Sequence, residues 1–331
     1  MARSDLLRRL FASYARGDDA AFRSAAVDLI ADERRKRHDL LATELERALE
    51  TDMRPGAAVP LTLRPLPKTR DDRPLLRLIK PARRFEDLVF ESRTVGALAE
   101  IVEEHLHRGV LASHSLRPRQ RLLFVGPPGT GKSATAHAIA ADLSLPVAMA
   151  SLPAMMSSFL GETSRNVEAV IRFAEQTPCV LVFDEFDTLA QERGERGDHG
   201  EVRRVVATVL QLLEDMHGES IAVATSNHPG LLDAAIWRRF DDVVSFSPLD
   251  VDGIGRLLEL RLRAIRSELA VPYWAESMVD VTPAEVEMVC WDAMRRMVLR
   301  DTDTLTDDLM GEAVERMRDR QSVISSYRDV R

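Results

Sequence analysis

The chain has 331 residues, of which 45% are hydrophobic and 30% charged, and its formal net charge is −8. This length suffices for a buried core in one large domain or in two to three modest ones. The acidic total argues against a broad nucleic-acid-binding surface, which needs a basic footprint. Its cysteines, Cys179 and Cys290, have no metal-ligand spacing, which favours a reducing compartment. No apolar run reaches the length of a membrane span, and residues 1–10 do not resemble a signal peptide, so we expect a cytoplasmic protein without a nucleic-acid or membrane partner.

Residues 1–50 predict a small helical bundle or hairpin. Apolar residues recur there at helical spacing in three separate stripes, within residues 6–14, 22–30 and 41–49. The second stripe consists of Phe22, Ala25, Ala26, Leu29 and Ile30. Ordinary packing is the simplest explanation for such stripes, and the sequence leaves open whether the partner is the chain itself or another protein.

Residues 51–84 are interpreted as an extended linker. Repeated prolines, from Pro55 to Pro81, exclude a helix interior because proline fixes φ and lacks an N–H donor. Many arginines lie among them. A solvated linker is the simpler reading of these charges, and contact with an acidic surface is the alternative.

Residues 85–248 predict an α/β domain in which short apolar strands alternate with helices. Strands are expected at 121–125, 146–151, 179–183, 221–225 and 242–246. This alternation is typical of a parallel sheet that helices cover on both faces. From residue 249 to 331 only helices are evident, which predicts a small all-α domain at the end of the chain.

A phosphate-binding loop follows the first of these apolar strands. It reads Gly126-Pro127-Pro128-Gly129-Thr130-Gly131-Lys132-Ser133 and precedes a predicted helix. Its glycines let backbone N–H groups turn toward phosphates, and the helix presents its positive end to them. Lys132 would reach the β- and γ-phosphates of ATP, and Ser133 would ligate Mg²⁺. A glycine-rich turn without function is the alternative, and the strand–loop–helix context disfavours it.

Two carboxylates, Asp184 and Glu185, follow the very apolar strand at 179–183. Charge at the end of a buried strand needs a partner, and a metal ion is one. Asp184 would hold Mg²⁺, and Glu185 would orient and deprotonate the attacking water. By itself this pair is better explained by a strand that merely surfaces at Asp184, but its place after a phosphate loop favours the nucleotide site.

With GPPGTGKS and LVFDEFD in this order, the chain from about residue 85 onward resembles an AAA ATPase of the AAA+ superfamily. The resemblance implies a phosphate-loop α/β domain with a helical lid, ATP hydrolysis with Mg²⁺, and a small bacterial type of member that remodels proteins or regulates a partner. The N-terminal helices lie outside it.

The resemblance also assigns roles to residues after the acidic pair. Asn227, at the end of the strand at 221–225, resembles the residue that positions the hydrolytic water, on a strand between those of the phosphate loop and the acidic pair. Arg238 and Arg239 resemble the arginines that reach into the neighbouring subunit's ATP site. They imply a hexameric ring, whereas a surface arginine pair bound to Asp241 or Asp242 is the alternative.

Phe159 resembles the aromatic residue of the central pore loop in protein-remodelling relatives, where it grips an extended polypeptide. A core phenylalanine is the alternative. Residues 282–285 (TPAE) predict the capped start of a lid helix. Many relatives carry glycine or arginine at this start, and this chain shows neither clearly. Arg295 and Arg296 come too late in the helix to be assigned this role.

The sequence leaves three functions to be considered. The first is an ATP-driven remodeller or unfoldase that threads a protein client through an oligomeric ring. The second is an ATP-controlled switch that assembles on a partner effector, such as a protease, and regulates it without threading. The third, a motor on DNA or RNA, is disfavoured by the acidic charge and by the aromatic residue at the proposed pore.

Overall fold

The computed structural model describes residues 19–35, 65–156, 162–188 and 199–328. The chain divides into two compact units, residues 1–62 and 63–331. In the first unit the structure describes helix α2 (Asp19–Arg35), which contains the second predicted stripe. Ala25, Ala26 and Ile30 of this stripe are buried, as its spacing predicts. The other two stripes lie outside the described residues.

The second unit contains a six-stranded sheet with the order β1-β3-β4-β5-β2-β6. Its strands are β1 (Leu76–Ile79), β2 (Arg121–Val125), β3 (Val147–Ala150), β4 (Val180–Phe183), β5 (Ile221–Ser226) and β6 (Asp242–Ser245). All pairs are parallel except β1 with β3. The predicted α/β fold is confirmed, and so is the position of β5 between the strand of the phosphate loop and the strand of the acidic pair.

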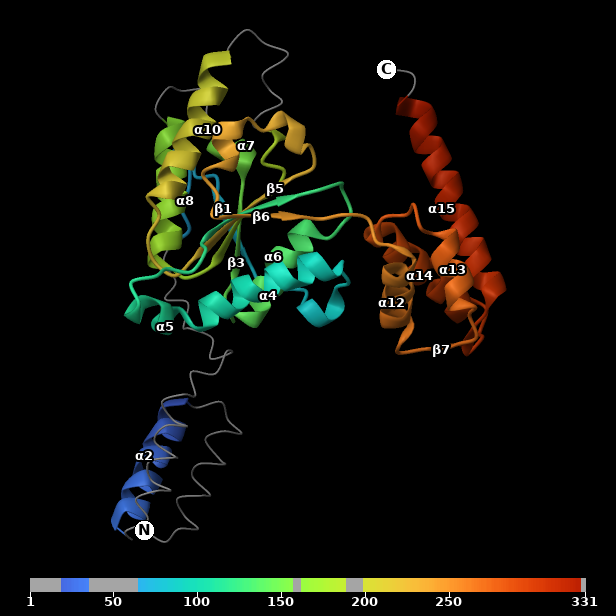
Figure 1. The fold of residues 1–331 in the computed structure, drawn as a ribbon, viewed down its shortest axis with the longest axis horizontal. Helices are drawn as coiled ribbons and strands as arrows, with labels where there is room; N and C mark the ends of the chain where they lie inside the picture. Colours follow the sequence, from blue (N-terminus) through green and yellow to red (C-terminus); the bar gives the residue numbers. More distant parts are fainter. Residues whose placement is uncertain (1–18, 36–64, 157–161, 189–198, 329–331) are drawn as a thin grey trace. The chain divides into compact units, whose positions relative to one another are not determined.

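Helices cover both faces of this sheet (Figure 1). The helices of the α/β part are α4 (Ser92–Leu106), α5 (Arg108–Ser113), α6 (Lys132–Asp142), α7 (Leu152–Met155), α8 (Glu162–Gln176), α10 (His199–Glu214) and α11 (Ala234–Trp237), with short 3-10 turns at Phe85–Asp87 (η1) and Pro229–Leu231 (η2). Alternate strand residues point to opposite faces. In β4, Val180 and Val182 join the core beneath α4 and α6, whereas Leu181 and Phe183 join the core beneath α7, α8 and α10.

Strand β1 corrects the interpretation of residues 51–84 as a linker. Leu76–Ile79 pairs antiparallel with β3 at the edge of the sheet, and Leu75 and Leu76 are buried. The prolines on either side, Pro74 and Pro81, misled the sequence reading, because proline is excluded from a strand interior but tolerated beside an edge strand. The short proline-free apolar run between them was the signal for a strand.

The C-terminal part is mainly helical. Its helices are α12 (Val251–Leu262), α13 (Val271–Ser277), α14 (Pro283–Leu299) and α15 (Asp307–Arg328). They share a core of their own, centred on residues such as Leu258, Val286 and Met310. A parallel pair of two-residue strands, β7 (Arg266–Ser267) and β8 (Thr304–Leu305), departs from the purely helical prediction. The domain boundaries drawn from the sequence stay predictions.

Candidate functional site

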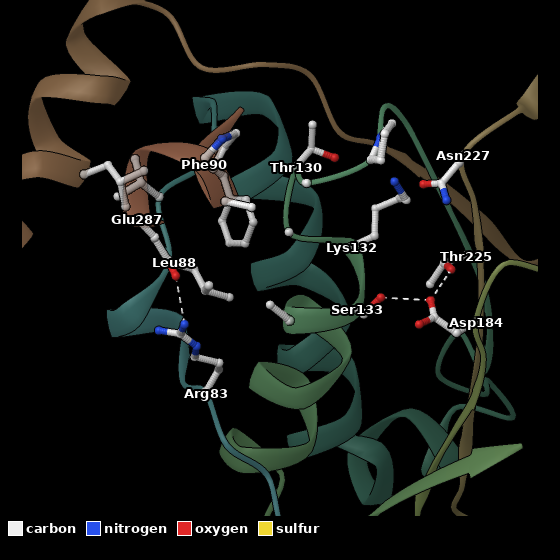
Figure 2. Close-up of a pocket in the computed structure, with 18 of the residues that line it drawn as sticks. Arg83, Leu88, Phe90, Thr130, Lys132, Ser133, Asp184, Thr225, Asn227 and Glu287 are labelled. Atoms are coloured by element: carbon white, nitrogen blue, oxygen red, sulfur yellow. Dashed lines mark hydrogen bonds and ion pairs between the residues drawn. The ribbon is translucent and has the colours of Figure 1, made fainter. Parts of the chain in front are cut away.

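A cavity of about 330 Å³ lies between the phosphate loop, the ends of β4 and β5, and the C-terminal helices. Figure 2 shows the residues that line it. Those predicted from the sequence are Pro128, Gly129, Thr130, Gly131, Lys132, Ser133, Asp184, Glu185 and Asn227. Segments nearly a hundred positions apart in the sequence thus converge on one space, as expected at the carboxyl edge of a parallel sheet.

The phosphate loop has a backbone that only glycine adopts readily. Gly126 has a φ of +149°, and a Cβ there would lie 2.1 Å from the Phe246 carbonyl oxygen. Gly129 has a φ of +78°, and a Cβ there would lie 2.8 Å from the Thr282 hydroxyl of the lid. These close approaches fix the loop between β6 and α14, with its N–H groups at the start of α6.

Lys132 is almost fully buried, with 6% of its surface exposed. Its Nζ donates to the carbonyl oxygens of Gly126 and Pro127, at 2.7 Å each. Burial lowers the pKa of this ammonium, and the neighbouring carboxylates, Asp184 first, act in the opposite direction. The Lys132 ammonium therefore lies against the phosphate loop. It can exchange its bonds to these carbonyl oxygens for a bond to a phosphate oxygen.

Ser133 and Asp184 lie in direct contact. The Ser133 hydroxyl donates to Asp184 Oδ1 at 2.8 Å, and the Thr225 hydroxyl donates to the same oxygen at 2.6 Å (Figure 2). A hydroxyl and a carboxylate beside a phosphate site form the hard oxygen set that Mg²⁺ prefers. The residues present therefore fit a magnesium ion.

Glu185 and Asn227 also line the cavity. Glu185 is exposed and has a left-handed backbone, with a φ of +52°. Asn227 follows β5 directly, and the next backbone N–H, that of His228, donates to Asp187 Oδ2 at 2.9 Å. The turn at residues 184–187, called the acidic turn below, is thus hydrogen-bonded to the turn after β5.

The lid contributes the start of α14. Thr282 and Glu285 form the predicted capping box, and the Ala284 N–H donates to the Gly129 carbonyl at 3.1 Å. The lid helix is therefore bonded to the phosphate loop itself. Arg295 and Arg296, further along α14, pair with Asp292 and do not line the cavity.

The far end of the cavity contains residues that the sequence analysis missed. Glu287 of α14 accepts from Arg83 Nη2 at 2.9 Å and also bonds to Arg261 of α12. Leu88, Phe90 and Leu257 add apolar surface beside this cluster. Apolar surface at this end of the cavity suits a nucleobase. The basic residues before residue 85 were a signal, because one of them, Arg83, pairs with the carboxylate of Glu287.

Arg238 and Arg239 do not line the cavity. Arg239 Nη1 pairs with Glu214 of α10 at 2.8 Å. Arg238 is exposed and has no ion-pair partner among the described residues. The partners considered from the sequence are taken by other residues. Asp241 is bound by Arg121, and Asp242 by Arg119.

Phe159 lies outside the described residues, so its proposed place in a pore loop stays a prediction. In the described ranges, no helix is both long and apolar enough to cross a membrane.

Comparison of the sequence with known proteins also indicates an ATPase. Residues 122–248 match the model of the ATPase family associated with various cellular activities (AAA). The chain is 36% identical over 304 residues to an uncharacterized AAA family ATPase, y4kL, of Sinorhizobium fredii, covering 90% of each chain. It is 30% identical over 287 residues to a proteasome-activating nucleotidase of Methanococcus maripaludis, covering 80% of this chain and 70% of the relative.

A third relative is much longer than this chain. The peroxisomal ATPase PEX6 of Penicillium chrysogenum is 32% identical over 227 residues, which are 64% of this chain but only 16% of the relative. From the matched domain, the near full-length similarity to y4kL and the phosphate-loop cavity, it follows that the chain belongs to the AAA family of ATPases and hydrolyses ATP.

Proposed function

We propose that the chain assembles into a hexameric ring and uses ATP hydrolysis at the boundaries between subunits to remodel a protein client. The observation that carries the proposal is an incomplete site. The phosphate loop, both acidic residues and Asn227 face one cavity, while Arg238 and Arg239 lie outside it. An exposed arginine that has no ion-pair partner in the described part of the chain, such as Arg238, is available to a neighbouring subunit.

The reaction splits ATP and water into ADP and phosphate. Lys132 and the backbone N–H groups at the start of α6 hold the phosphates. Ser133 and Asp184 hold Mg²⁺, which offsets the phosphate charge when bound. Glu185 takes a proton from the attacking water, and Asn227 orients that water.

Arg238 is the better candidate for the arginine that completes a neighbouring site, since Arg239 is held by Glu214. We expect Arg238→Ala to lower kcat by roughly 100- to 1000-fold and Arg239→Ala to lower it less, because a lost donor at the transition state costs rate directly. ATP affinity should change little in both variants. Steady-state ATPase kinetics and ATP titration measure these two effects.

Mixing two inactive variants tests whether the arginine acts between subunits. A ring that contains both Arg238→Ala and Glu185→Gln subunits has some sites with an intact base and a neighbour's intact arginine. Activity should therefore reappear on mixing. If the mixture stays inactive although mass measurement detects mixed rings, the arginine acts within its own subunit and the shared site is wrong.

A protein client is supported by the name of a relative, a nucleotidase that activates a proteasome, and by Phe159. In the proposed ring, Phe159 grips the client in the central pore. We expect Phe159→Ala to abolish client processing while ATP hydrolysis persists. The client is first captured on the Glu185→Gln protein held with ATP, and the mass of the assembly is measured at the same time.

An ATP-controlled switch on a partner effector predicts a different outcome. In that case Phe159→Ala is harmless, and ATP binding alone changes the partner's activity. Unaltered processing of the captured protein by Phe159→Ala would therefore favour the switch over threading.

The proposed location of the protein is the cytoplasm.

A further inference from the structure

Thr225 lies at the centre of the contacts between the acidic turn and β5. Strands β4 and β5 are parallel, and their last paired positions are Phe183 and Ala224. The next residues along, Asp184 and Thr225, therefore meet at the edge of the cavity. Thr225 is 1% exposed, so its hydroxyl must be bonded within the protein.

The Thr225 hydroxyl bonds to both members of the acidic pair. It donates to Asp184 Oδ1 at 2.6 Å and accepts from the Glu185 N–H at 3.0 Å. The Thr225 carbonyl accepts a third bond, from the Phe186 N–H at 2.8 Å. One residue of β5 thus holds the side chain of Asp184 and the backbone on both sides of the Glu185 Cα.

These bonds matter because the Glu185 backbone is in an unfavourable conformation. A φ of +52° is rare for a residue with a side chain, and such a conformation persists only where the surroundings enforce it. The direction of the Glu185 carboxylate depends on this φ. The hydroxyl that fixes the N–H of Glu185 therefore helps fix where its carboxylate points.

We propose that Thr225 is a positioning residue for hydrolysis, whose hydroxyl aims Glu185 at the attacking water and orients Asp184 toward Ser133 and the metal. This inference rests on the roles proposed above for Asp184 and Glu185. Thr225 acts through them and does not touch the reacting atoms.

The same strand supplies a matched control at its other end. Ser220 precedes β5 and is fully buried. Its hydroxyl accepts from the Cys179 N–H, just before β4, at 3.0 Å and donates to the Ala174 carbonyl. Ser220 thus makes the same kind of cross-strand contact as Thr225, but it does not line the cavity.

The experiment compares Thr225→Val, Thr225→Ser and Ser220→Ala in the full chain. Valine keeps the shape of threonine without its hydroxyl, and serine restores the hydroxyl. We expect Thr225→Val to lower kcat by about 10- to 100-fold, since small misplacements of a reacting group cost that much. The KM for ATP should stay within about threefold, because the change removes alignment and not ground-state binding. Thr225→Ser should recover most of the rate.

A role in stability alone predicts another pattern. Thr225→Val and Ser220→Ala would then lower the unfolding temperature by similar amounts. The two variants would also have the same kcat when the rate is expressed per folded molecule. An equal kcat in these two variants would overturn the proposal, and so would a serine variant as slow as the valine one.

The Glu185→Gln background separates this inference from the proposed function. If Thr225 acts by aiming Glu185, Thr225→Val should lower the residual rate of Glu185→Gln little further, because the group it aims is already absent. A full additive loss would overturn the aiming of Glu185 and leave only the bond to Asp184 to explain the effect of Thr225. If Glu185→Gln itself keeps the normal rate, the assignment of the base fails, whatever Thr225 does.

Discussion

Replacing Glu185 by glutamine should lower ATP hydrolysis by about 1000-fold, because the variant loses the carboxylate that is proposed to accept the proton of the attacking water. Glutamine has nearly the same shape, and Glu185 is exposed at the cavity, so the fold and the phosphate loop should be unaffected. ATP affinity should therefore remain close to that of the unaltered chain. Single-turnover hydrolysis and ATP titration by calorimetry measure the two quantities.

Glu168→Gln is a matched control for this variant. Glu168 is an exposed carboxylate on α8 that pairs with Arg172 one helical turn away, and exposed pairs of this kind contribute little. The control should hydrolyse ATP at the normal rate. Should Glu185→Gln do the same, another group must activate the water, and the proposed chemistry of the acidic pair would be wrong.

Local signals in the sequence were sufficient for most of the fold. Except for β6, which begins with Asp242 and ends with Ser245, each strand of the parallel sheet is a mainly apolar run, and alternate residues of these runs are buried on opposite faces. The phosphate loop was predictable because eight consecutive residues supply its glycines, its lysine and its hydroxyl. Strand β1 was missed because its neighbouring prolines outweighed a short apolar stretch.

Contacts between distant residues were not predictable in the same way. Arg83 and Glu287 are 204 positions apart and meet only because the lid folds over the phosphate loop. Thr225 and Asp184 are 41 positions apart, and the strand register that joins them follows from the order of the sheet. A threonine at the end of an apolar strand carries no such information by itself, since threonine is common in strands.

Replacing Lys132 by methionine should affect an earlier step, the binding of ATP. Methionine retains an unbranched side chain but lacks the ammonium that is proposed to bind the phosphates. The lost charge-assisted hydrogen bonds should lower ATP affinity by about 100-fold. In the proposed mechanism the same charge also stabilises the transferring phosphoryl group, so kcat/KM should fall by about 1000-fold.

Lys68→Met provides the comparison for Lys132→Met. Lys68 is half exposed and pairs with Asp72, far from the cavity lining, so this variant should bind and hydrolyse ATP normally. If Lys132→Met bound ATP as tightly as Lys68→Met does, the cavity would not be the nucleotide site.

Comparing Lys132→Met with Glu185→Gln then separates two ways of losing activity. The lysine variant should fail to capture a client because it does not hold ATP, whereas the glutamine variant should retain the client because it holds ATP without splitting it.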